Sequence, residues 1–411
     1  MGQRATTGAH ADGTAMAGAT TEFEQDVMDL LVETLRRAVR REVPVVGTDT
    51  LLGELVSGDT DAGAAIAPGM RKAGSLSGLI SGRAGLGWVS DDEAGAAPVP
   101  AGTDEEADRE ADEREVEFAW REAWWRVGLA SGRSAPDSDR AQPAMTGALR
   151  GCLLLALGSA RAEATVSVRC RHVARALLTL PDTRAREALT LQRLDTAAAA
   201  HALDRLDEAE TEGVESRGVT LLRRAGTLGR SGNRLSRAIA SWTSQSTVNG
   251  SPVLFAVSVE AIRQAVRCGR AAAEPVDLLL GMLALDRALS VAGHSLPASL
   301  ADVNSAADLM RRHGARQASL VPAAAAPRPE SVSDGDGVQL SAAADRMMAV
   351  ARLSAAEHGS PTVGTVHLLA ALLDAAETDA DAAAGSVVRL LTAERVDVDA
   401  LRSELSLRLG A

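Results

Sequence analysis

Tyrosine is absent from this sequence, and lysine occurs only once. Of the 43 basic residues counted as Lys and Arg, Lys72 is the single lysine. It follows Arg71 and precedes Ala73, so it has no glycine before it and no Ser or Thr after it. The phosphate-binding loop of P-loop NTPases ends in Gly-Lys-Ser/Thr. The chain is therefore not a P-loop NTPase, and a Schiff-base mechanism would have to use Lys72.

Aromatic residues and positive charge are also scarce. Aromatics make up 2% of the 411 residues, and the formal net charge is -12. Proteins that bind single-stranded nucleic acid stack the bases on aromatic side chains. Proteins that bind duplexes gain most of their affinity from Lys and Arg on phosphates. The composition predicts that nucleic acid is not a partner.

The three cysteines, Cys152, Cys170 and Cys268, are scattered, and no two have CxxC spacing. This pattern indicates neither a disulfide framework nor a zinc site, but free thiols in a reducing compartment. No apolar run approaches the roughly 20 residues that span a bilayer. Residues 1–20 lack the charged start and apolar stretch of a signal peptide. We expect a cytoplasmic protein without a metal, a cofactor or a membrane partner.

Helical periodicity is the dominant positive signal. Hydrophobic residues make up 46% of the chain, enough to build buried cores. Apolar side chains recur at helical spacing over residues 23–41 and through 145–211. Alternation of β-branched and aromatic residues never persists. The sequence predicts an all-α fold.

Changes in composition divide the chain into two predicted domains. Residues 74–103 are rich in Gly, Ser, Ala and Pro, which is typical of a flexible segment. The predicted organisation begins with a disordered N-terminus at 1–20 and a first domain at 21–211. That domain has repeats at about 21–73 and 145–211, separated by a flexible, acidic and Trp-rich helical insertion at 74–144. A bridge at 212–249 leads to a second domain at 250–411, with repeats at about 250–321 and 338–411 and a linker at 322–337.

An internal repeat underlies this division. Residues 343–373 align without a gap with 148–178, and both segments place a histidine and an Ala-Leu-Leu sequence at the same positions. The same frame recurs at 274–283 and 46–55. The sequence thus predicts four copies of one unit, in which a long helix, a short turn and a second helix follow one another.

The local chemistry of the turns supports this frame. Thr48 and Thr365 stand where a turn becomes a helix, and a hydroxyl there can cap backbone N–H groups. The Leu-Leu-x-x-Leu pattern that follows gives the second helix one apolar face. A single unit cannot bury that face alone, so we expect the copies to pair.

Two of the turns carry a family resemblance. Val-Gly-Thr-Val-His-Leu-Leu at 363–369 and Val-Gly-Thr-Asp-Thr-Leu-Leu at 46–52 resemble the Gly-Thr-Glu-His-hydrophobic-Leu signature of Clp N-terminal repeats. In that family two repeats pair with pseudo-two-fold symmetry into a domain that receives substrates and adaptors of Clp unfoldases. The resemblance covers roughly 300 residues. It implies two tandem Clp-N-like domains without the ATPase modules.

The resemblance also suggests ligand-binding residues. Phe23 lies at the family's spacing ahead of the first signature, and Asp49 occupies the acidic position that helps the family bind phosphoarginine. Thr50 follows Asp49 where the family has histidine. The equivalent acidic position in the other copies reads Arg171, Val276 and Val366.

Six further residues are expected to have structural roles at the repeat turns. Hydrogen-bonding side chains recur at the start of each second helix, which favours capping over catalysis. These residues are Thr48, Thr50, His172, Asp277, Thr365 and His367.

Three tryptophans form a separate candidate surface. Trp120 and Trp124 share a helix face, with Trp125 beside them. This cluster either packs on the first domain or forms a partner surface, because Trp is enriched in interface hot spots.

The expected function is that of a non-catalytic protein- or peptide-binding module, an accessory factor or adaptor of a Clp protease. Its partners would be Clp ATPase or protease components, or client polypeptides. The alternative is a sequestering protein that binds Clp-directed cyclic peptide antibiotics. An enzyme hidden in the insertions is a remote alternative, since no nucleophile-base pair or metal-ligand set is visible in the sequence.

Overall fold

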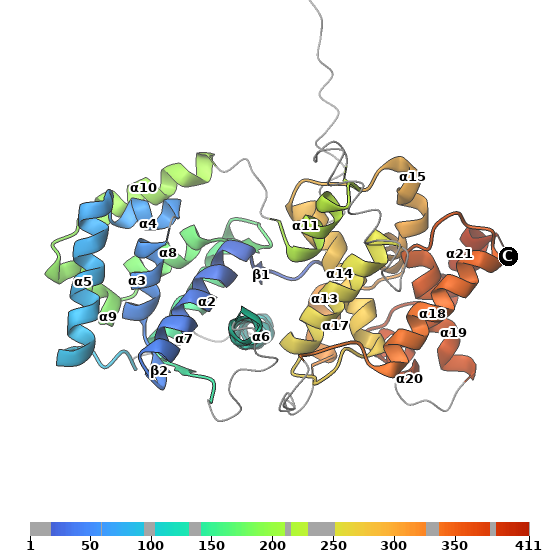
Figure 1. Cartoon of the computed structure of the whole chain (residues 1–411), viewed down its shortest axis with the longest axis horizontal. Coiled ribbons are helices and arrows are strands. Elements are labelled where there is room, and N and C mark those ends of the chain that lie inside the picture. The colour runs from blue at the N-terminus through green and yellow to red at the C-terminus, as the bar shows by residue number, and fades with distance from the viewer. Residues whose placement is uncertain are drawn as a thin grey trace, which may run out of the picture. The chain divides into compact units, whose positions relative to one another are not determined.

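The protein is all-α, as predicted, and its regular structure consists almost entirely of helices (Figure 1). The computed structural model describes residues 18–58, 60–93, 103–130, 141–209, 215–228, 251–325, 337–378 and 384–410. Strands within these ranges are limited to two-residue segments. No helix in the described part of the chain combines the length and apolar character needed to cross a bilayer.

The chain divides into two compact units. The first unit comprises Thr21–Glu212, and the second comprises Gly213–Ala411 together with Met1–Thr20. Helix α11 (Arg217–Arg224), which lies in the predicted bridge, packs against the second unit's helix α13 (Pro252–Arg267). Residues 229–250, which form most of the predicted bridge and include Trp242, lie outside the described residues, as do residues 1–17 of the predicted disordered N-terminus.

The first unit contains two sets of four helices and one additional long helix. In chain order its elements are β1 (Glu22–Phe23), α2 (Gln25–Arg40), β2 (Val45–Val46), α3 (Thr48–Ser57), α4 (Asp61–Ile66), α5 (Met70–Leu86), α6 (Thr103–Ala130), β3 (Ala144–Met145), α7 (Gly147–Ala162), β4 (Ser167–Val168), α8 (Cys170–Thr179), α9 (Arg184–Leu191) and α10 (Thr196–Ala209). Helices α2–α5 form the first repeat, and α7–α10 form the second.

The two repeats of the first unit pair reciprocally through their short strands. Strand β1, which precedes the long helix of the first repeat, runs parallel to β4 in the turn of the second repeat. Strand β2, in the turn of the first repeat, runs parallel to β3, which precedes the long helix of the second repeat. Each of the two segments that precede a long helix thus pairs with the turn of the other helical set.

The insertion at 74–144 contains two helical parts. The first, up to Leu86, differs from the flexible segment predicted there, whereas a helix is expected for the second, which carries the tryptophans. Helix α5 continues to Leu86 because Leu76 and Ile80, one turn apart, are both fully buried beneath its Gly- and Ser-rich surface. Burial of these side chains outweighs the low helix propensity of the glycines. Helix α6 spans Thr103–Ala130 and packs against α2 and α7. Residues 94–102 and 131–140 of the insertion lie outside the described residues.

The second unit is also built from helices, and its short parallel pairing is a single bridge. After α11 and α13 it contains α14 (Pro275–Val291), α15 (Ala298–Ala301), the 3-10 helix η1 (Asp302–Asn304), α16 (Ala306–Arg312), α17 (Gln317–Ala323), α18 (Ala342–Glu357), α19 (Thr365–Thr378), α20 (Ala384–Ala393) and α21 (Val398–Leu409). A parallel bridge joins Ala273, in the turn before α14, to Leu340, which precedes α18. Residues 326–336 of the predicted linker at 322–337 lie outside the described residues.

The apolar faces of the repeats meet in the interior of each unit. In the first unit Leu31, Leu51, Leu149 and Val173, one from each of the four central helices, are completely buried. Burying one such side chain contributes about 1.5–3 kcal/mol to stability. The repeat turns therefore lie at the ends of helices whose positions are fixed by the core, and their polar side chains are held in place.

Candidate functional site

The two repeat histidines lie at the same place, three residues after the residue that caps their helix. His172 Nδ1 accepts a hydrogen bond from the backbone N–H of Arg169 (2.8 Å), and His367 Nδ1 accepts one from Gly364 (3.1 Å). Because Nδ1 accepts, the proton of neutral His172 is on Nε2, which lies 3.0 Å from Glu163 Oε2. Both rings are buried. Each closes the turn at the start of its helix, in the manner of a capping box.

Asp277 takes the place of the histidine in the third repeat. Its Oδ2 accepts from the backbone N–H of Glu274 at 2.9 Å, which is the same closure of the turn. Arg270 Nε donates to the same oxygen at 2.9 Å. Burial raises the pKa of Asp277, although Arg270 favours its ionised form. Thr50 occupies the equivalent position in the first repeat and is half-buried.

A second shared feature concerns the first backbone N–H of each second helix. In three repeats this N–H donates to a side-chain oxygen from elsewhere in the same unit. The pairs are Thr48 with Asp92 (2.8 Å), Cys170 with Asp26 (2.9 Å) and Thr365 with Asn304 (3.1 Å). In the third repeat the residue is Pro275, which has no N–H to satisfy. In all four turns the first N–H of the second helix is therefore either bound by a side-chain oxygen or absent. This shared requirement explains why the turn geometry is retained although the sequences of the turns differ.

Asp92 accepts the most hydrogen bonds of these three side chains. It is completely buried and has φ of 64°. Its Oδ2 accepts from the N–H of Thr48 (2.8 Å) and the hydroxyl of Thr146 (2.8 Å). Its Oδ1 accepts from the Thr48 hydroxyl (2.8 Å) and the Arg184 N–H (3.0 Å). One carboxylate thus binds the N-terminal ends of α3, α7 and α9, where helix dipoles favour negative charge.

The glycine of the signature makes these turns compact. A Cβ atom at Gly47 would lie 2.9 Å from Asp92 Oδ2 and 2.6 Å from Asp49 Oδ1. A Cβ atom at Gly364 would overlap the carbonyl of Val303. The Gly-Thr pair of the first and fourth repeats therefore combines a close backbone approach with a capping hydroxyl.

The two predicted ligand-binding residues are both buried. Phe23 is 2% exposed and belongs to the core of the first unit. Asp49 is 5% exposed, and Arg184 Nη1 lies 3.8 Å from its Oδ1. Burial raises the pKa of Asp49, Arg184 opposes this, and the neighbouring Asp92 adds to it. The cation that Asp49 faces is supplied by the chain itself, so in this conformation neither residue offers much surface to a peptide.

The tryptophans of α6 are divided between the interior and its edge. Trp120 is 5% exposed and its Nε1 donates to the carbonyl of Pro143 at 2.9 Å. Trp124 packs half-buried against the core, and Trp125 is half-buried too. Trp120 therefore packs α6 onto the rest of the first unit, whereas part of the surface of Trp124 and Trp125 is exposed to solvent.

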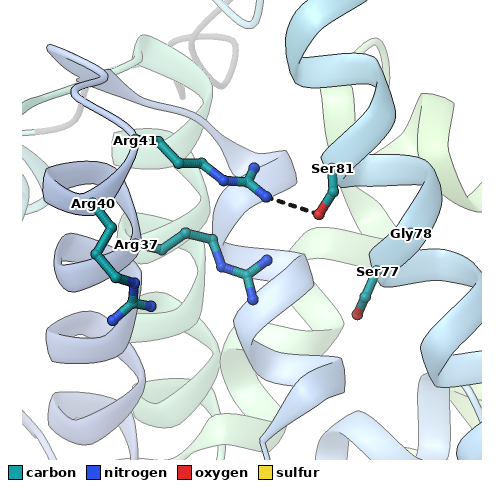
Figure 2. Close-up of a pocket in the computed structure, with 6 residues that line it drawn as sticks. All are labelled: Arg37, Arg40, Arg41, Ser77, Gly78 and Ser81. Atoms are coloured by element: carbon teal, nitrogen blue, oxygen red, sulfur yellow. Dashed lines mark hydrogen bonds between the residues drawn. The ribbon is translucent and has the colours of Figure 1, made fainter.

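An arginine pocket on the first repeat was missed from the sequence. It has a volume of about 390 Å³ and lies between the end of α2 and the middle of α5; its lining residues are Arg37, Arg40, Arg41, Ser77, Gly78 and Ser81. Figure 2 shows the guanidinium groups of Arg37 and Arg41 pointing from α2 toward α5. The basic run at 36–41 is visible in the sequence, but the composition of residues 74–103 predicts a flexible segment. The opposite wall of the pocket was therefore not expected.

Hydrogen bonds fix part of this arginine pocket. Arg41 Nη2 donates to Ser81 Oγ at 2.8 Å. Arg37 forms an ion pair with Glu54, a half-buried carboxylate on α3. Burial raises the pKa of Glu54, while Arg37, Arg40 and Arg41 lower it. Of the three arginines that line the pocket, Arg37 is thus the one held in an ion pair with Glu54.

Comparison of the chain with protein-family models, curated proteins and solved structures gives no match. Among the described residues, no group of three or more His, Cys, Asp or Glu side chains is arranged to hold a metal ion. The function of the chain is therefore inferred from the geometry of the repeats and of the arginine pocket.

Proposed function

We propose that the protein is a non-catalytic polypeptide-binding module that acts as an accessory factor or adaptor of a Clp protease. The observation that carries this proposal is the reciprocal pairing of the two repeats in the first unit. Strand β1 pairs with β4 and β2 with β3, as expected if the two repeats are related by a pseudo-two-fold axis. Such a pair is the arrangement that the resemblance to Clp N-terminal repeats implies.

The repeat turns give further support. The Gly-Thr pairs at 47–48 and 364–365 make the same contacts in the two units, a close approach of the glycine and a threonine N–H bound by a side chain. The hydroxyl of Thr48 also accepts from the first turn of α9, and that of Thr365 accepts from the start of α16. These shared contacts favour one repeat type used four times. Fold likeness alone is a weak guide to function, so the partner must be identified by experiment.

Two consequences follow for the setting of this function. All three cysteines are buried thiols that are not joined in disulfides, which is compatible with the cytoplasm, where we place the protein. The partners we expect are Clp ATPase or protease components and client polypeptides. Phosphoarginine is not expected to bind at Asp49, because that carboxylate is buried beside Arg184.

Affinity capture of the tagged chain from lysate of its own host, read by quantitative mass spectrometry, tests the proposal. We expect enrichment of a Clp ATPase, a Clp protease subunit or their clients over a tag-only control. A parallel capture includes an excess of a Clp-directed cyclic peptide. Loss of the captured proteins would place the peptide and the proteins on one surface.

Two outcomes would contradict the adaptor proposal. The first is equal recovery of Clp components and clients with the tagged chain and with the tag alone. The second is tight binding of the cyclic peptide by the purified chain without any captured polypeptide, which would favour sequestration instead.

A further inference from the structure

The arginine pocket carries an excess of positive charge that the repeat architecture does not require. Arg40 and Arg41 are exposed, and Glu54 is ion-paired with Arg37 at the inner end of the site. Cations in the last turn of a helix are favoured by its dipole, which accounts for arginines at the end of α2. It does not account for a pocket whose second wall, on α5, carries hydroxyl groups.

The hydrogen-bond donors of the pocket can be followed atom by atom. Ser57 donates to the carbonyl of Gly53 (2.6 Å), so in its contact with Ser77 (2.7 Å) the donor is Ser77. Ser81 Oγ accepts from Arg41, which leaves its own hydroxyl proton able to donate. The pocket therefore presents the Ser81 hydroxyl together with guanidinium N–H groups, and these are all donors.

We propose that this pocket binds a doubly charged oxyanion of the phosphate class, either free or carried as a phosphomonoester on a larger molecule. Guanidinium groups bind phosphate oxygens through paired, charge-assisted hydrogen bonds. Once Glu54 has neutralised one of the three arginines, the other two match the charge of a dianion. The volume of about 390 Å³ falls in the range of small-molecule sites.

The rest of the chain makes this pocket selective for a compact anion. The net charge of -12 opposes long polyanions, which need many Lys and Arg contacts along their backbone. A nucleic acid is therefore disfavoured, whereas a single phosphate group needs only the local field of the arginines. This inference does not rest on the proposed adaptor function, and either can fail alone.

Isothermal titration calorimetry on the full chain, at constant ionic strength and pH 7.5, tests the proposal. The probes are inorganic phosphate, a phosphoserine peptide, its unphosphorylated counterpart, a short oligonucleotide and chloride. A phosphomonoester is mostly a dianion at this pH because its second pKa is about 6. The variant Arg40→Gln/Arg41→Gln removes two exposed charges, and Arg224→Gln is the matched control on the second unit.

We expect saturable binding of phosphate or of the phosphopeptide, with no binding of chloride or of the unphosphorylated peptide. The double variant should weaken it at least about tenfold, because it removes two guanidinium groups that form charge-assisted hydrogen bonds with the phosphate oxygens. Arg224→Gln should bind as the wild type does. Preference for the phosphopeptide would assign the group to a polypeptide, and preference for inorganic phosphate would assign it to a small molecule.

Three results would overturn the proposal. They are the absence of saturable binding to either phosphate probe, unchanged affinity in the double variant, and tighter binding of an oligonucleotide than of both phosphate probes through the same arginines. Circular dichroism of the variant verifies its fold. Ser81→Ala provides a second test, because it removes one neutral donor and should weaken binding less than the double variant.

Discussion

Replacement of Asp92 by asparagine should destabilise the first unit, although the two side chains have the same shape. Each carboxylate oxygen of Asp92 faces one backbone N–H, from Thr48 on Oδ2 and from Arg184 on Oδ1. A backbone N–H cannot turn away as a hydroxyl can. An asparagine amide therefore places its NH₂ group against a backbone N–H in either orientation. Asparagine also tolerates positive φ, so the backbone itself is not strained.

The magnitude follows from the bonds lost. One hydrogen bond to a charged acceptor, of about 1.5–3 kcal/mol, disappears in Asp92→Asn. We expect the free energy of unfolding to fall by about 2–3 kcal/mol. For a unit of this size, that corresponds to a fall in Tm of roughly 5–10 °C. Asp92→Ala leaves both N–H groups and both hydroxyls without this acceptor, and should cost about 3–5 kcal/mol.

Tryptophan fluorescence during urea denaturation of the full chain provides the assay. Four of the five tryptophans lie in the first unit: Trp88, Trp120, Trp124 and Trp125. Asp91→Asn is the control, because this neighbour is exposed and its replacement should change stability by less than about 0.5 kcal/mol. A midpoint for Asp92→Asn equal to that of Asp91→Asn would refute the assignment of Asp92 as the buried link between three helices.

Three further predictions concern other positions. Gly364→Ala should destabilise the second unit by about 2 kcal/mol or more, because the new Cβ would overlap a backbone carbonyl. Gly82→Ala lies in open space on α5 and should stabilise the first unit by about 0.5–1 kcal/mol. Thermal unfolding of the two variants checks both expectations. Burial lowers the pKa of His367, so the unfolded chain takes up a proton at this residue before the folded chain does. The free energy of unfolding should therefore fall as the pH drops below about 6.5. Urea titrations at pH 7.5 and 5.5 measure this loss of stability, which should be smaller in His367→Gln. Burial raises the pKa of the thiols of Cys152 and Cys170, so a thiol reagent should label them only at the rate of unfolding, and fast labelling of the native protein would contradict their burial.

The sequence was sufficient for the helical fold because periodicity and capping residues are local signals. The turn positions Thr48, His172 and His367 could be found by aligning the chain with itself, since each is fixed by bonds within its own turn or unit. Asp92 could not be found in this way. It lies in a Gly- and Ser-rich segment, and its importance comes from bonds to residues 44, 54 and 92 positions away along the chain.

The candidate sites likewise depend on tertiary contacts that the sequence alone does not reveal. Phe23 and Asp49 were chosen because of their positions in a motif, which does not reveal that both side chains are buried. The arginine pocket needs α5 as its second wall, and the glycines of α5 conceal the apolar pair Leu76 and Ile80 that makes this helix stable. The composition of this segment favours a loop, but tertiary packing stabilises it as a helix.

The effect of the chain on a reconstituted Clp protease is the most direct test of the adaptor proposal. The measurement is the degradation rate of a client captured with the chain, using the host's purified Clp ATPase and peptidase, across a titration of the chain. We predict a saturable change in that rate, with no change for a client that the chain does not capture. An unchanged rate for the captured client at every concentration, together with no measurable binding to the Clp ATPase, would contradict the account.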